Sequence, residues 1–162
     1  MILGVLKIIN ILTVFWYTQV LLPLEPGEEN FWTRINISAA IVEASDDPDD
    51  WALLARIARW ESWYKPSVAD CRQRSSCGAS GPFQVIPRSK EEKDLICGDW
   101  TESARRALMR VNESRTICWR LPKAEQLAQY ATGNCGDLGK KMSRLRYATA
   151  KDMFDAVNNF TP

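Results

Sequence analysis

One glutamate stands in an apolar helical stripe and is the first candidate for chemistry. Glu61 follows Leu54, Ile57 and Ala58 at helical spacing, so the four side chains share one face of an expected helix. An apolar setting disfavours a charged carboxylate, so the pKa of Glu61 is expected to rise, as a general acid acting on a glycosidic oxygen requires. The alternative is a carboxylate at the edge of this face, tipped into solvent or paired with an arginine.

The element that must position Glu61 is marked at both ends. Asp47 can cap the helix and Pro48 suits its first position, because the N–H that proline lacks would be unpaired there. Lys65-Pro66-Ser67 is expected to end regular structure, since the residue before a proline is pushed out of the helical region.

A second candidate element follows, over residues 75–87, which are rich in Gly and Ser and contain Gly81-Pro82-Phe83-Gln84. We expect a short hairpin or an irregular loop here. A glutamine inside an apolar run has a desolvation cost, which favours a functional role for Gln84.

Composition excludes several classes of chemistry and partner. The chain has 162 residues, 46% of them apolar, and no His, which removes Ser-His-Asp and Cys-His catalysis and the His-containing zinc sites. No metal or organic cofactor is implied. The net charge is +1 and the basic residues are spread along the chain, a pattern that does not indicate nucleic acid as a partner.

Residues 1–24 are mostly apolar, with Lys7 the only charged side chain, and the run is long enough to span a bilayer. We expect a signal-anchor or, second, a cleaved signal peptide, with the rest exported to the periplasm or another extracytoplasmic space; a buried helix is the alternative. Five cysteines without a C-x-x-C pair fit disulfides in an oxidising compartment, although reduced buried cysteines remain an alternative. Cys118 and Cys135 could bridge, and Cys71 could pair with Cys77, which would leave Cys97 odd.

The remaining pattern is mostly helical. A linker is expected over 25–34 and a catalytic domain over 35–162. Further helices are expected over 35–44, 101–119, 122–133 and 138–147, and a last one that starts at 149–152. The predicted fold is therefore mainly α, a helical bundle around the helix of Glu61, with a small hairpin or loop insert.

Three blocks in order carry a family resemblance. They are Glu61-Ser62 at the end of an apolar helix, the stretch 78–87 (GASGPFQVIP), and residues 129–133 (QYATG). They resemble the catalytic Glu-Ser, the Gly-x-x-Gly-Leu-Met-Gln block and the Ala-Tyr-Asn-x-Gly block of the soluble lytic transglycosylase-like family of the lysozyme superfamily. The third block departs from the pattern, because Ala131 stands where the family usually has a substrate-holding Asn.

The resemblance implies an α+β lysozyme-like fold and cleavage of the β-1,4 bond between N-acetylmuramic acid and N-acetylglucosamine in peptidoglycan, leaving a 1,6-anhydro sugar. Glu61 would be the only catalytic acid and base. The implied substrate-binding residues are Ser62, Gly81, Phe83, Gln84 and Tyr130. Four of them have a structural alternative: an ordinary helix serine for Ser62, backbone geometry for Gly81, and core packing for Phe83 and Tyr130.

Other functions stay open. A hydrolysing muramidase of the same fold needs a second carboxylate to activate water, for which Asp70 is the candidate. A non-catalytic peptidoglycan-binding protein, or an anchored component of a secretion or conjugation apparatus or of a virion, is also compatible with the sequence.

Overall fold

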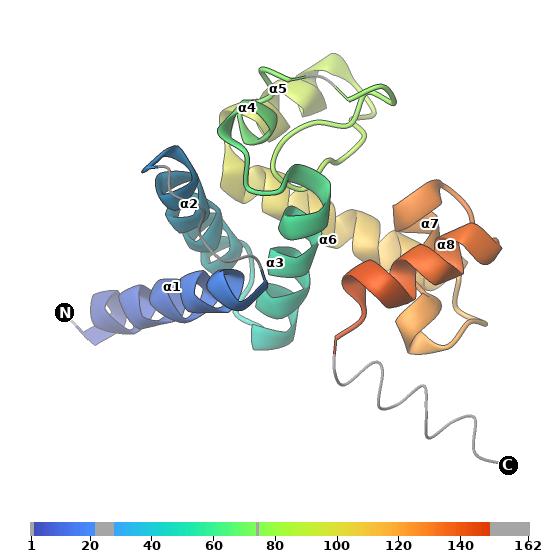
Figure 1. The fold of residues 1–162 in the computed structure, drawn as a ribbon, viewed down its shortest axis with the longest axis horizontal. Helices are drawn as coiled ribbons and strands as arrows, with labels where there is room; N and C mark the ends of the chain where they lie inside the picture. Colours follow the sequence, from blue (N-terminus) through green and yellow to red (C-terminus); the bar gives the residue numbers. More distant parts are fainter. Residues whose placement is uncertain (1, 22–27, 74, 150–162) are drawn as a thin grey trace, which may run out of the picture. The chain divides into compact units, whose positions relative to one another are not determined.

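The computed structural model describes residues 2–21, 28–73 and 75–149. The prediction of a mainly α-helical protein is confirmed: these residues form eight α-helices and no β-strand (Figure 1). The chain divides into two compact units, 1–107 and 108–162, each of which is described by itself. The catalytic domain expected over 35–162 therefore includes residues of both units.

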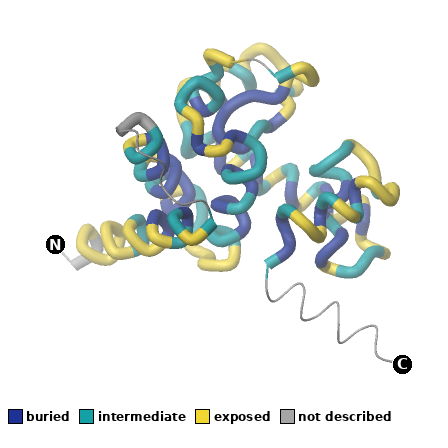
Figure 2. Tube along the Cα trace, viewed as in Figure 1, coloured by how far each residue is buried: buried dark blue, intermediate teal, exposed yellow. Residues whose placement is uncertain are grey.

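Unit 1 consists of five helices and the first part of a sixth. They are α1 (Ile2–Leu21), α2 (Glu28–Ala44), α3 (Pro48–Ser62), α4 (Pro66–Ala69), α5 (Lys90–Gly98) and the start of α6 (Trp100–Ile117). Helices α1 and α2 pack on each other and on α3. Their shared core includes Ile37, Ile41, Leu54 and Ile57, none of which is exposed (Figure 2).

Helix α3 forms where its end signals predicted. The Asp47 side chain accepts a hydrogen bond from the Asp49 N–H at 2.9 Å, and Pro48 occupies the first helical position. Trp63 ends the helix in a left-handed conformation, and the buried Tyr64 hydroxyl donates to the Ala55 carbonyl at 2.7 Å. This bond ties the chain beyond α3 back onto the helix, so the end that carries Glu61 is held in place.

Two helix starts and one whole helix differ from the sequence-based expectation. Helix α2 begins at Glu28, inside the expected linker, because its Phe31 ring packs edge-on against Phe15 of α1 at 5.4 Å. Regular structure resumes as α4 with Pro66 at its first position, where proline is tolerated. Helix α5 was missed altogether, although Ser89 and Glu92 carry the capping signal: the Ser89 Oγ accepts from the Glu92 N–H at 3.1 Å.

Unit 2 contains the end of α6, a 3₁₀ turn (Lys123–Glu125), α7 (Ala128–Thr132), α8 (Asp137–Met142) and a π-helical turn (Ser143–Tyr147). Helix α7 ends at Gly133, at a φ of +80°, as predicted. Two buried serines connect these short elements. The Ser114 Oγ donates to the Gln126 carbonyl at 2.8 Å, and the Ser143 Oγ donates to the Ala124 carbonyl at 2.7 Å. The helix expected after 149–152 lies outside the described residues.

Two disulfides cross-link the chain, one within each unit. Cys71 pairs with Cys97 and Cys118 pairs with Cys135, whereas Cys77 is free and exposed. The Cys118–Cys135 bridge confirms one suggested pair, and the suggested Cys71–Cys77 pair was wrong because α5 brings Cys97 to Cys71. An apolar helix near the N-terminus together with two disulfides suggests export.

Removal of either disulfide is expected to destabilise the unit that carries it. The bridged cysteines are 26 and 17 residues apart, so the loop-entropy estimate is about 3.5 kcal/mol for Cys71–Cys97 and about 3 kcal/mol for Cys118–Cys135. Urea unfolding of the paired Cys→Ser variants measures these losses. Cys77→Ser is the control and should leave the midpoint nearly unchanged; an equal loss there would contradict the assignment.

Candidate functional site

Glu61 lies in the last turn of α3, at the edge of its buried face. Ile57 and Ala58, one turn earlier, are fully buried, whereas Glu61 is half-buried. The Glu61 side chain therefore starts next to the core, and the residue is still partly accessible from outside, as an acid that acts on a bound substrate must be. Its expected raised pKa stays a prediction.

The loop of the second block folds into a tight turn. Ser80 and Val85 form an isolated antiparallel bridge with N–H···O distances of 3.0 Å in both directions. Gly81 and Gln84 adopt positive φ values of +74° and +47° between them. The Gln84 backbone N–H and side-chain Nε2 both donate to the Gly81 carbonyl, at 3.1 and 2.9 Å. The expected hairpin is thus reduced to one closed turn, with the Gln84 side chain folded across it.

The inside of this turn belongs to the core of unit 1. Phe83 is fully buried, so core packing describes its ring better than a place in an open groove. A Cβ at Gly81 would lie 2.8 Å from Ile96 Cγ2 and 2.8 Å from Ser103 Oγ, which shows that the turn is pressed against α5 and α6. Gly81 and Phe83 therefore shape the turn from its buried side, and a role of either toward substrate stays a prediction.

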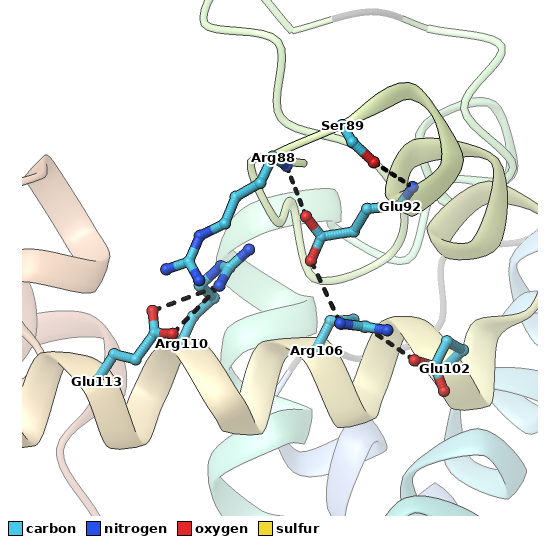
Figure 3. A network of polar contacts seen from close by, with 7 residues as sticks. All are labelled: Arg88, Ser89, Glu92, Glu102, Arg106, Arg110 and Glu113. Carbon is cyan, nitrogen blue, oxygen red and sulfur yellow. Dashed lines mark hydrogen bonds and ion pairs between the residues drawn. The ribbon is translucent and has the colours of Figure 1, made fainter.

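Helix α5 is held by contacts near both of its ends. Cys97 is bonded to Cys71 at the start of the loop, and an ionic network joins α5 to α6 (Figure 3). In this network Glu92 accepts from the Arg88 N–H at 2.6 Å and pairs with Arg106 at 3.7 Å, and Arg106 also bonds Glu102 at 2.8 Å. Further along α6, within unit 2, Arg110 pairs with Glu113 at 3.3 Å. The contacts within unit 1 hold α5 on the first part of α6, against which the turn rests.

Cys77, which directly precedes the second block, lies within electrostatic range of the acid. The hydrogen bond with the Ser75 Oγ (3.4 Å) and the backbone amide of Ala79 lower the pKa of the Cys77 thiol, whereas burial and, more weakly, the charge of Glu61 raise it. Sequence reasoning did not consider Cys77 together with Glu61. The odd number of cysteines indicated one free thiol, but the sequence-based pairing left Cys97 unpaired instead of Cys77.

Alkylation of Cys77 is expected to report on Glu61. Glu61→Gln removes a charge that opposes thiolate formation, so the thiol pKa should fall further and the alkylation rate below that pKa should rise. The pH profile of iodoacetamide labelling, read by mass spectrometry, measures the change. Asp49→Asn, at the opposite end of α3, is the matched control; the same acceleration there would show that the effect does not come from the charge at position 61.

A cavity of about 180 Å³ lies between the loop and α5. Its polar lining includes Gln73, Ser75, Ser80 and Lys93. Lys93 stands one helical turn before the disulfide-bonded Cys97, so the two share the face of α5 that meets the loop. The second block is therefore bordered by a small hollow that several polar side chains line, one of them cationic.

Three other candidates are placed as follows. Ser62 is buried, and its Oγ donates to the Ala58 carbonyl at 2.9 Å while accepting from the Tyr64 N–H at 3.3 Å, so it stabilises the helix end. The Asp70 carboxylate bonds Arg72 through the Nε at 2.6 Å and the backbone N–H at 3.2 Å. Tyr130 lies on α7 in unit 2, edge-on to Tyr147 at 5.7 Å. A role of Ser62 or Tyr130 toward substrate stays a prediction.

One exposed aromatic group follows the acid. Trp63 is 47% exposed. Its backbone has a φ of +55°, which is a costly conformation for a bulky residue. Its ring is edge-on to Trp60 at 6.4 Å, and the Arg59 guanidinium lies 4.3 Å over the Trp60 ring. Two indoles therefore flank Glu61 in the chain, one of them open to solvent.

No group of three or more His, Cys, Asp or Glu side chains suited to a metal ion occurs within residues 2–21, 28–73 and 75–149. In comparisons with protein-family models, curated proteins and solved structures, none matches this chain.

Proposed function

We propose that the protein is a peptidoglycan-cleaving lytic transglycosylase of lysozyme-like architecture, with Glu61 as its single catalytic acid and base. The observation that carries the proposal is the half-buried carboxyl group of Glu61 at the end of the apolar helix α3, in the same unit as the closed Gly-Ala-Ser-Gly-Pro-Phe-Gln turn. Both motifs resemble those of one family, and α3 supplies the acid that its chemistry needs.

The chemistry needs one carboxyl group acting twice. Protonated Glu61 gives its proton to the bridging oxygen of the β-1,4 bond, and the C1–O bond of the N-acetylmuramic acid residue breaks. The resulting carboxylate then removes the proton of the 6-hydroxyl of the same sugar, whose oxygen bonds to C1 and closes the 1,6-anhydro ring. Glu61 ends protonated and no water is consumed, so no second carboxylate is required.

The surroundings of Asp70 support this mechanism over hydrolysis. An inverting hydrolase needs a second carboxylate that orients a water molecule, and a retaining one needs a carboxylate nucleophile. Both oxygens of Asp70 are engaged by Arg72 within the loop. A carboxylate held in this way is poorly placed for either task.

Two side chains are suited to bind the glycan. Gln84 bonds its own turn through Nε2, which directs the amide oxygen elsewhere, where it can accept from an N-acetyl N–H of the sugar. Trp63 offers an exposed indole face on which a sugar ring can stack. The protein would act outside the cytoplasm, held at a membrane by residues 1–24, alone or as part of a secretion, conjugation or virion assembly.

The test is the identity of the products. Full-length protein, solubilised in detergent, is incubated with purified peptidoglycan and the soluble fragments are analysed by mass spectrometry. Anhydro-muramoyl ends are expected. Reducing ends would replace the proposal with a muramidase, and binding to peptidoglycan without release of any fragment would replace it with a non-catalytic wall-binding protein.

A further inference from the structure

Helix α1 turns several polar groups to the protein and exposes a row of apolar side chains on its outer side. Four polar contacts join its inner side to α2 and α3. They are Lys7 with Glu43, the Tyr17 hydroxyl with Arg56 Nε (3.0 Å), Gln19 Oε1 with Arg34 Nη1 (3.3 Å), and the Leu21 carbonyl with Arg59 Nε (2.6 Å). Val14, Phe15 and Thr18 are buried on the same side. Apolar side chains thus lie on both sides of α1, whereas a surface helix of a water-soluble protein has a polar outer face.

Figure 2 shows much of α1 as exposed, and the outer side of this helix carries a strip of apolar side chains. Its exposed side chains include Val5, Leu6, Ile9, Leu12, Trp16 and Val20, which are 49–80% exposed. The hydroxyl of Thr13, also on this side, donates to the Ile9 carbonyl at 2.9 Å and is satisfied within the helix. A monomeric soluble protein rarely leaves an apolar patch of this length in water.

We infer that α1 stays docked on α2 and α3 and lies flat on a lipid bilayer, with this outer strip in the boundary between headgroups and acyl chains. From Val5 to Val20 the strip is about 22 Å long. The window Gly4–Leu21 is apolar enough to cross a membrane by composition alone. The Thr13 hydroxyl is satisfied within the helix, as contact with hydrocarbon demands. The strip carries no charge, and its Trp16 indole has an apolar body and one N–H donor, which suits the boundary between headgroups and acyl chains and favours lipid as the occupant.

The inner contacts explain why a flat orientation is preferred to crossing. A crossing α1 would have to leave α2 and α3, which would break all four polar contacts and expose the apolar groups beneath Val14 and Phe15. It would also carry Lys7 away from Glu43, whose carboxyl pKa the lysine now lowers. A flat helix keeps every one of these contacts. The inference concerns the attachment of the protein and does not depend on the proposed catalysis.

The first experiment distinguishes flat from crossing. Full-length Gly4→Cys and Val20→Cys, each in a Cys77→Ser background, are labelled with NBD and bound to preformed phosphatidylcholine vesicles with one quarter phosphatidylglycerol. A Cβ at Gly4 has open space, so the change is tolerated. Dithionite added outside should quench both labels equally. Protection of the Gly4 label alone would mean that α1 crosses, and would overturn the inference.

The second experiment tests the occupant of the strip. Leu12→Gln should weaken partition into the same vesicles by about tenfold, because one apolar side chain is lost from the lipid contact. Ile86→Gln, at a residue 58% exposed outside α1, is the matched control and should leave partition unchanged. Unchanged partition of Leu12→Gln would overturn the inference. So would a dimer in lipid-free solution that this substitution dissociates, because the strip would then bind a second copy.

Discussion

Glu61→Gln is expected to lower the rate of anhydro-muramoyl release by about 10²–10⁴-fold or more. Glutamine keeps the size of the side chain but has no acidic proton for the leaving oxygen, and general acid catalysis alone contributes a factor of this order. Because the same carboxyl group acts as base in the ring closure, both steps are affected. The release rate from purified peptidoglycan, followed by mass spectrometry, measures the loss.

The controls separate catalysis from folding. Asp49→Asn changes a carboxylate in the first turn of the same helix and should retain cleavage, with a stability loss of at most about 1 kcal/mol at the helix N-terminus. Asp70→Asn should also retain cleavage if one carboxyl group suffices. Full activity of Glu61→Gln with an unchanged unfolding midpoint would remove Glu61 from the mechanism, and loss of activity in Asp70→Asn alone would indicate a hydrolase centred on that residue.

Gly81→Ala is expected to destabilise unit 1 by about 2–5 kcal/mol. The left-handed backbone at φ +74° costs an alanine about 1–2 kcal/mol, and the methyl group would meet Ile96 and Ser103 at 2.8 Å, where overpacking adds about 1–3 kcal/mol. The midpoint of urea unfolding gives the loss. Because the turn that carries Gln84 would shift, the cleavage rate should fall as well.

Gly78 supplies a matched control for this prediction. It has a similar φ of +81°, but a Cβ there would meet no atom within 4 Å. Gly78→Ala should therefore cost only the backbone term, about 1–2 kcal/mol. The difference between the two variants isolates the packing of the turn on α5 and α6. Equal losses at the two positions would show that the turn is not pressed against these helices.

The local features of α3 could be predicted from the sequence because they depend on neighbours in the chain. The Asp47 cap, the proline at the first position and the apolar face before Glu61 involve residues within a few turns of one another. The same holds for the end of α7 at Gly133. Helix α5 carries an equally local signal at Ser89, whose Oγ accepts from the Glu92 N–H, so this helix too can be predicted from its neighbours in the chain.

The rest of the site depends on contacts between residues far apart in the chain, which spacing does not encode. Cys71 has a near neighbour at Cys77, yet it bonds Cys97, because α5 folds back over the loop and is held by Arg106. The burial of Phe83 follows from the same packing. No periodicity in residues 75–87 indicates which side of that loop faces the core.

The polar contacts on the inner side of α1 bear on how the protein matures. A signal peptidase that removed residues 1–24 would take away the acceptors that Gln19, Tyr17 and Leu21 provide for three arginines, and would uncover apolar surface of α2 and α3. Proteolytic processing would then amount to the deletion of a core helix from a folded unit. The mature protein is therefore expected to keep its N-terminal residues, and N-terminal sequencing after export should find them.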